Sequence, residues 1–225
     1  MCGRYSLTKS LDDLASFFEL YELAQKPNLA PRWNIAPTQG SAVLRLSADH
    51  HPEIAMLRWG FAGPNNAPLI NARSETAAGK PTFREAFAAR RCLVPADGFY
   101  EWQAIDGQKA KQPWRIGLKG GGLFAFAGLW QREPAFGDAD CFTILTTAAN
   151  DYLAPLHERM PVILPRERFS LWMDPATPPA ILLRLLQPYP AEAMARYRVT
   201  AAVNSIRTDD ESCFVPLNPA LKRAA

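Results

Sequence analysis

The stretch CLVPADGFYEWQ (residues 92–103) decides the fold class, because two strand-like segments follow one another without a helix between them. Residues 92–95 and 99–105 are dominated by apolar and aromatic side chains, which is typical of strands. Asp106-Gly107 then predicts a tight turn into a further strand over residues 113–118. Because strands joined by tight turns pair antiparallel, this stretch favours an antiparallel sheet over a doubly wound one.

The same pattern extends outward on both sides of this stretch. Apolar runs and alternation predict further strands over residues 3–7, 41–46, 53–59, 123–130, 141–147 and 197–203. Helices are predicted over residues 82–90, 166–173 and 179–186, and Ser10 with Asp13 forms a capping box that starts another. Strands dominate and do not alternate regularly with helices. We therefore expect an α+β fold: a single domain over residues 1–225 with a mostly antiparallel, barrel-like β-sheet flanked by short helices.

Composition excludes several classes of protein. The chain has 225 residues, 48% of them hydrophobic, and a formal net charge of +3. It has neither a signal-peptide pattern nor an apolar run of the roughly 18 residues that span a membrane, so we expect a cytoplasmic protein with no membrane partner. The four cysteines lack CxxC spacing, which argues against a zinc site or a disulfide framework. We expect no metal and no cofactor, and three of the cysteines are predicted to be core residues: Cys92, Cys141 and Cys213.

Positive charge is concentrated between Arg58 and Arg91. This segment contains two acidic residues, Glu75 and Glu85, against six basic ones: Arg58, Arg73, Lys80, Arg84, Arg90 and Arg91. The excess of four is larger than the net charge of the whole chain. It is consistent either with a phosphate-binding groove or with an ordinary solvated basic face.

Cys2 stands directly behind the initiator methionine. Removal of Met1 leaves an α-amine and a thiol on neighbouring carbons, so one aldehyde can be captured twice, first as an imine and then by the sulfur. The product is a five-membered thiazolidine ring. An α-amine titrates near 8 and a free thiol near 8.5, so both are usable near neutral pH. The alternative is an incidental cysteine at a frayed terminus.

Three polar residues are candidates to assist this chemistry. Glu101 lies in an apolar strand, so burial should raise its pKa and suit it to proton transfer; the alternative is a buried glutamate paired with an arginine. His157 follows a proline-containing turn and can act as acid or base at a cleft edge, although a lone histidine is more often structural. Asn71 and Asn150 can each orient a nucleophile or a carbonyl, and spacing alone selects neither.

Several blocks of the sequence together resemble the SOS response-associated peptidase family, whose members are abasic-site processing proteins. The resemblance runs from residue 2 to about residue 217, with the blocks in order. They are MCGR (1–4), WNIAPT (33–38), RWG (58–60), NARSET (71–76), PADGFYEW (95–102), LTTAAN (145–150), HERMPVIL (157–164) and VNS (203–205).

The resemblance implies a protein that binds single-stranded DNA and crosslinks its N-terminal cysteine to the ring-opened aldehyde of an abasic site. Cys2 matches the nucleophile, Asn71 the residue that positions it, and Glu101 the acid/base that assists imine formation. His157 matches the group that handles the sugar oxygen and helps the crosslink reverse. The positions that match contacts to DNA or residues that shape its path are Arg4, Pro37, Trp59, Arg73, Arg84 and Trp102.

The resemblance also implies that abasic-site single-stranded DNA is the partner, and we expect a monomer that associates with the nucleoid when bound to DNA. One departure stands out. Family members usually follow Arg-Trp-Gly with Leu-Ile-Pro and a further tryptophan, whereas Gly60 here precedes FAGPNN (residues 61–66). Stacking on an aromatic side chain stabilises each base by about 1–3 kcal/mol, so we expect weaker DNA binding or an altered preference for junctions.

Two other functions remain open from the sequence. One is an N-terminal-nucleophile peptidase or amidase, with Cys2 as nucleophile and Asn71 in an oxyanion hole, which could also remove Met1 autocatalytically. The other is a passive single-strand binder that uses the basic segment, and its binding would not depend on Cys2.

Overall fold

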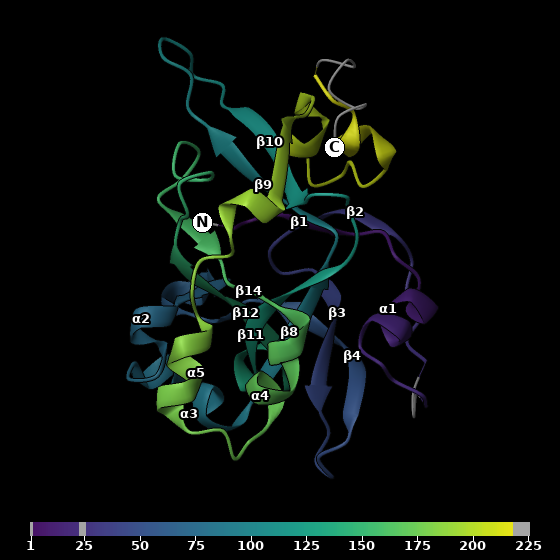
Figure 1. The fold of residues 1–225 in the computed structure, drawn as a ribbon, viewed down its shortest axis with the longest axis vertical. Helices are drawn as coiled ribbons and strands as arrows, with labels where there is room; N and C mark the ends of the chain where they lie inside the picture. The colour runs from purple at the N-terminus through teal and green to yellow at the C-terminus, as the bar shows by residue number, and fades with distance from the viewer. Residues whose placement is uncertain (1, 23–25, 218–225) are drawn as a thin grey trace.

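The structure is a computed structural model that describes residues 2–22 and 26–217 (Figure 1). The predicted C-terminal boundary of the domain, at residue 225, lies outside the described residues. A five-stranded sheet has the order β15-β10-β9-β1-β2, with β1 (Tyr5–Leu7), β2 (Arg32–Ile35), β9 (Gly98–Gln103), β10 (Gln112–Leu118) and β15 (Met194–Arg198).

An eight-stranded sheet forms the larger part of the molecule. It contains β3 (Gly40–Leu46), β4 (Pro52–Trp59), β7 (Asn71–Arg73), β8 (Arg91–Ala96), β11 (Phe124–Glu133), β12 (Ala139–Ala148), β13 (Arg159–Pro161) and β14 (Ile163–Leu164). Five of these strands close on themselves, since the pairings run β12–β4–β3–β8–β11 and back to β12. Within this sheet β12 pairs parallel with β4 and β7. The predicted fold, mostly antiparallel and barrel-like, is confirmed.

Short helices surround the sheets. They are α1 (Leu11–Phe17), α2 (Ser74–Ala77), α3 (Pro81–Ala89), α4 (Phe169–Met173) and α5 (Pro179–Leu185), together with single 3-10 turns at Pro64–Asn66, Pro134–Phe136, Arg166–Arg168, Ala191–Ala193, Ala201–Asn204 and Glu211–Phe214. The capping box predicted at Ser10 and Asp13 is present. Along the described residues, no helix combines the length and apolar character needed to cross a membrane.

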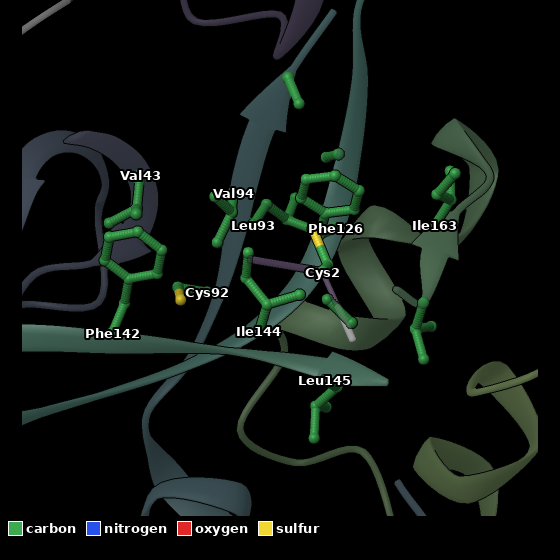
Figure 2. Close-up of a cluster of buried hydrophobic side chains, with 14 of the residues drawn as sticks. Cys2, Val43, Cys92, Leu93, Val94, Phe126, Phe142, Ile144, Leu145 and Ile163 are labelled. Carbon is green, nitrogen blue, oxygen red and sulfur yellow. The ribbon is translucent and has the colours of Figure 1, made fainter. Parts of the chain in front are cut away.

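The barrel interior is packed with apolar side chains, among them Phe126, Phe142 and Ile144 (Figure 2). Gly128 is required on β11, because a Cβ there would lie 2.8 Å from the Cys92 sulfur. The same cluster includes residues of the five-stranded sheet. The two sheets therefore share one core, which agrees with a single domain.

A buried carboxylate fastens β1 to this core. Asp97 accepts hydrogen bonds from Ser6 Oγ at 2.6 Å and from the Thr8 backbone N–H at 2.7 Å, and Arg115 pairs with it at 3.3 Å. Backbone pairing of Tyr5 with Phe99 adds to this attachment. The N-terminal segment is consequently held in place rather than frayed from residue 2 onward.

The strand predicted over residues 197–203 is wrong in its position. β15 begins at Met194 and ends at Arg198, and the chain then turns into the 3-10 segment at 201–204. The Asn34 amide imposes this turn, since its Nδ2 donates to Ser205 O at 2.9 Å and Thr208 O at 2.6 Å. The short strands β7 and β13 are among those that were not predicted.

Candidate active site

Cys2 lies beside β9 at the end of the five-stranded sheet's β1. Tyr100 N–H donates to Arg4 O at 2.9 Å, which carries the β1–β9 pairing one residue further toward the N-terminus. In the chain that still carries Met1, the Cys2 side chain is fully buried within the hydrophobic core (Figure 2). Burial, and then the negative charge of Glu101, raises the pKa of the Cys2 thiol far above its ordinary value. The thiol is therefore protonated at neutral pH and needs a base before it can attack.

Asn71 fixes the main chain of Cys2. β7 pairs parallel with β12, with Asn71 opposite Ile144, and this register directs the amide toward the N-terminus. Its Nδ2 donates to the Cys2 carbonyl oxygen at 2.9 Å. Its Oδ1 is buried and accepts no hydrogen bond from the residues that the structure describes. The amide thus has one atom that holds Cys2 and one that remains available to a ligand.

Glu101 is 6% exposed on β9. Burial raises the pKa of Glu101 from 4.5 to about 6, so the carboxyl can both give and take a proton near neutral pH. Strand alternation is confirmed by the packing: Phe99 belongs to the main core, whereas Tyr100 and Trp102 pack in a second cluster around Val203. Glu101 accordingly projects to the same side of the sheet as Phe99.

His157 has a defined ring tautomer. The Arg159 backbone N–H donates to His157 Nδ1 at 2.9 Å, so a neutral ring carries its proton on Nε2. Burial lowers the pKa of His157, which keeps the ring neutral at physiological pH. The Nε2–H group is then a hydrogen-bond donor.

Strand pairing places β13, which follows the turn at His157, across β12 from β7, the strand of Asn71. Both β7 and β13 pair with β12, and Thr146 lies opposite Arg73 on one side and Pro161 on the other. Arg159 also forms a two-pronged ion pair with Glu75, with distances of 2.7 Å and 2.9 Å. Sequence reasoning did not select this pair as site residues, although both lie in the blocks at 71–76 and 157–164 that carry the resemblance.

The predicted DNA contacts fall into different environments. Arg73 and Arg84 are exposed. Arg4 is half-buried, and its Nη1 donates to Asn34 Oδ1 at 2.7 Å and to Val203 O at 2.9 Å. Trp102 lies under the Arg4 guanidinium at 5.7 Å and is itself tied to Asn204 by a 2.7 Å hydrogen bond. The side chains of Arg4 and Trp102 are therefore each held in one orientation by neighbouring residues.

Two of the predicted DNA contacts, Trp59 and Pro37, are buried or half-buried. Trp59 is fully buried, donates to Ile70 O at 2.9 Å and stacks on Phe142 with ring centroids 6.1 Å apart. Its ring has no face open for a base. Pro37 is half-buried in a turn whose next residue, Thr38, has φ 72° and donates its N–H to Trp59 O at 2.8 Å. Pro37 and Trp59 are thus joined through this turn.

The short segment after Gly60 supplies no replacement for the missing tryptophan. Phe61 begins β5 (Phe61–Ala62), which pairs with β6 (Pro68–Leu69), and its side chain is fully buried. Ala62 N–H donates to Glu133 Oε1 at 2.9 Å, which draws the segment down onto the barrel. This arrangement is consistent with the expectation that the segment lacks an exposed aromatic ring.

The basic segment between Arg58 and Arg91 is not one surface. Arg91 is buried and donates to the main-chain oxygens of Trp172 and Asp174 at 2.7 Å each, so it fastens α4 to the core. Arg58 covers the Phe136 ring at 4.2 Å, and Arg90 lies 3.7 Å from Glu85. The interpretation of the whole segment as a single phosphate-binding groove is therefore wrong.

The fold and this site define a class of protein in which a closed β-barrel holds a cysteine at the second position against an amide and a carboxylate of raised pKa. The chain belongs to the SOS response associated peptidase (SRAP) family, whose sequence pattern matches residues 1–206. The described residues contain no cluster of side chains able to hold a metal ion.

Two named relatives agree with this assignment. Abasic site processing protein YoqW of Bacillus subtilis (strain 168) is 39% identical over 214 residues, which cover 91% of this chain and 95% of that protein. Abasic site processing protein YedK of Escherichia coli (strain K12) is 36% identical over 180 residues, covering 77% and 79%.

Solved structures share the fold. A protein from Bacteroides thetaiotaomicron superposes with a TM-score of 0.80 at 23% identity, covering 96% of this chain and 100% of the other. A phage-related protein from Bordetella bronchiseptica gives a TM-score of 0.72 at 33% identity, covering 88% and 94%.

Proposed function

We propose that this protein captures abasic sites in single-stranded DNA as a covalent thiazolidine crosslink through Cys2, after removal of Met1, and so protects them from strand cleavage. The observation that carries the proposal is the close grouping at the N-terminus. Asn71 holds the Cys2 main chain at 2.9 Å, and Glu101 is near enough for its charge to act on the Cys2 thiol. Similarity to YoqW and YedK, which are named abasic site processing proteins, supports the same conclusion.

The chemistry proceeds in two bond-forming steps. The Cys2 amine attacks the aldehyde carbon of the ring-opened sugar, and loss of water gives an imine. The Cys2 sulfur then attacks the imine carbon, while the thiol proton is transferred to the nitrogen. No oxidant or other co-reactant is needed, since the only product released is water.

Each neighbouring group has a role that its environment supports. Glu101, with a pKa of about 6, gives a proton to the departing water during imine formation; its carboxylate then accepts the thiol proton and passes it to the nitrogen. His157 donates from Nε2 to the sugar oxygen, because Nδ1 is occupied by the Arg159 N–H. The same donation assists reversal, when the sugar closes again. Arg73, exposed on the strand of Asn71, supports a contact to a phosphate beside the lesion.

The test is denaturing electrophoresis of the purified protein with two single-stranded oligonucleotides. One carries a true abasic site and the other its tetrahydrofuran analogue, which has no aldehyde. A slowly migrating band is expected with the true abasic site only, and Cys2→Ala should abolish it. Cys2→Ser is the matched variant: it keeps the amine but removes the sulfur, so it should leave an imine that borohydride traps.

One outcome would refute the crosslinking proposal. If intact mass shows that Met1 has been removed and no band forms with the true abasic site, the crosslinking proposal is wrong. A mass measurement on Asn71→Ala and Cys2→Ala also reports whether the chain removes Met1 itself. Asn71 donates to the carbonyl oxygen of Cys2. The oxyanion hole of a peptidase would instead bind the carbonyl of Met1 or of a peptide substrate, so this hydrogen bond gives no independent support to a peptidase.

A further inference from the structure

One face of the five-stranded sheet carries a row of residues that leads away from Glu101. In the register of β9, β10 and β15, Glu101 lies opposite Trp114, and Trp114 lies opposite Arg198. Directly opposed residues of antiparallel strands project to the same face. The row therefore runs from a buried carboxylate, across a half-buried indole, to an exposed guanidinium.

Arginines and the indole are packed together in this row. Arg196 and Arg198 share a face two residues apart, and each guanidinium carbon lies 5.2 Å from the centre of the Trp114 ring. Trp114 Nε1 donates to Gln103 Oε1 at 3.0 Å, which fixes the ring in its plane. Such cation–π contacts hold a guanidinium in place while its N–H edges remain open to anions.

The row also reaches the turn that carries His157. Arg196 donates to the main-chain oxygen of Tyr152 and lies 4.5 Å from the centre of that ring. Two residues of the same turn, Leu153 and His157, are joined by a 3.1 Å backbone hydrogen bond. Trp114 and its two arginines thus lie between the strand of Glu101 and the turn of His157, and β9 and β10 can be followed in Figure 1.

The charge of this face suits a polyanion. On β10 and β15 the side chains that project to this face include two basic residues, Arg196 and Arg198, and no carboxylate. Arg115 projects to the opposite face, where it pairs with Asp97. None of the ion pairs within the described part of the chain involves Arg198. Burial is the main cause of the pKa shifts of Glu101 and His157, and the positive charge of Lys111 acts on both, so Lys111 lies near both.

We propose that Trp114, Arg196 and Arg198 form a second binding surface for the single strand that carries the abasic site, with Arg198 contacting a backbone phosphate. This inference rests on the proposed function for the identity of the strand. Grooves that bind single strands combine positive charge with aromatic side chains, as this row does. Neighbouring strands are about 4.8 Å apart, so Arg198 lies about 10 Å from Glu101, a length of about three stacked nucleotides.

The experiment measures equilibrium binding of the tetrahydrofuran oligonucleotide by fluorescence anisotropy, which needs no covalent step. Arg198→Gln should weaken binding and reduce the slope of log affinity against log salt by about 0.7, the value for one contact to a single strand. The ratio of wild-type to variant affinity should then fall about 2.6-fold between 50 and 200 mM salt. Arg132→Gln, an exposed arginine on the eight-stranded sheet, is the matched control and should bind as the wild type does.

Oligonucleotides shortened on one side locate the contact. When the flank that reaches the row is removed, Arg198→Gln and the wild type should bind equally, and shortening the other flank should preserve the difference. The crosslinking rate at saturating abasic DNA should not change in Arg198→Gln, because this residue does not touch the reacting atoms.

The proposal is overturned if Arg198→Gln binds like the wild type at every salt concentration, or if Arg132→Gln loses as much affinity. It is also overturned if the saturated crosslinking rate falls while affinity is unchanged, since Arg198 would then act through Glu101. Failure of the wild type to crosslink, with a salt-dependent defect in Arg198→Gln, would refute the proposed function and leave this surface standing.

Discussion

Glu101→Gln should make the protein more stable above pH 6 while it removes the proposed acid/base group of crosslinking. Glu101 is 6% exposed, and burial raises its pKa to about 6. Between pH 4.5 and 6 the folded protein consequently binds a proton at this position more tightly than the unfolded chain does. The free energy of unfolding of the wild type therefore falls as pH rises through this window. Glutamine is neutral at every pH, so the unfolding free energy of Glu101→Gln does not include this decrease.

The size of the effect follows from the pKa. A change from 4.5 to about 6 at about 1.4 kcal/mol per pKa unit gives about 2 kcal/mol. The difference in unfolding free energy between Glu101→Gln and the wild type should therefore grow by about 2 kcal/mol from pH 4 to pH 7.5. Above and below this pH window the difference should not change with pH. Loss of the acid/base group should slow crosslinking by about 100-fold or more.

Urea denaturation of both proteins at half-unit steps from pH 4 to pH 8 measures this difference, because the other titrating groups are common to both. Glu133→Gln is the matched control. Glu133 is also 6% exposed, but its Oε1 accepts hydrogen bonds from Ala62 N and Gln131 Nε2, so the variant should lose stability rather than gain it. A difference for Glu101→Gln that does not change with pH would refute the reasoning from burial.

Three further variants test the supporting structure. Asn71→Ala removes the 2.9 Å bond to the Cys2 carbonyl; it should cost about 1 kcal/mol of stability and slow crosslinking about tenfold in a quenched gel time course, and an unchanged rate would contradict its positioning role. Glu75→Gln breaks the fork with Arg159, where Glu75 is half exposed, so stability should fall by about 1 kcal/mol or less in thermal unfolding while the crosslinking rate falls more clearly. Asp97→Ala leaves several buried donors and a guanidinium without their acceptor and should cost about 3 kcal/mol in urea denaturation; a cost below 1 kcal/mol would show that β1 is held by backbone pairing alone.

Much of the fold follows from local pattern. The strand at 99–103, its turn and the capping box at Ser10 depend on neighbouring residues, and each is present. The error at residues 197–203 has a different origin, because the Asn34 side chain, about 170 residues away in sequence, binds backbone oxygens just after this segment, at Ser205 and Thr208. Likewise β7 has only three residues, and its register depends on β12. Pattern within a short window cannot reveal such distant hydrogen bonds.

The candidate site divides in the same way. Burial of Glu101 could be predicted from sequence because its strand is apolar. The alternation of Phe99 and Tyr100 also predicted the face of the sheet to which Glu101 projects. The exposure of the tryptophan side chains could not be predicted from sequence: Trp59 is fully buried, whereas Trp102 is half-buried. Both follow an acidic or basic residue in an apolar strand, and only the packing of the second sheet distinguishes them.

The burial of Cys2 has a consequence for oxidative stress. Peroxides attack thiolates that solvent can reach, and Cys2 is neither exposed nor ionised at neutral pH in the untrimmed chain. The remaining cysteines are buried as well. The untrimmed chain should therefore keep this sulfur in its reduced state under peroxide, until removal of Met1.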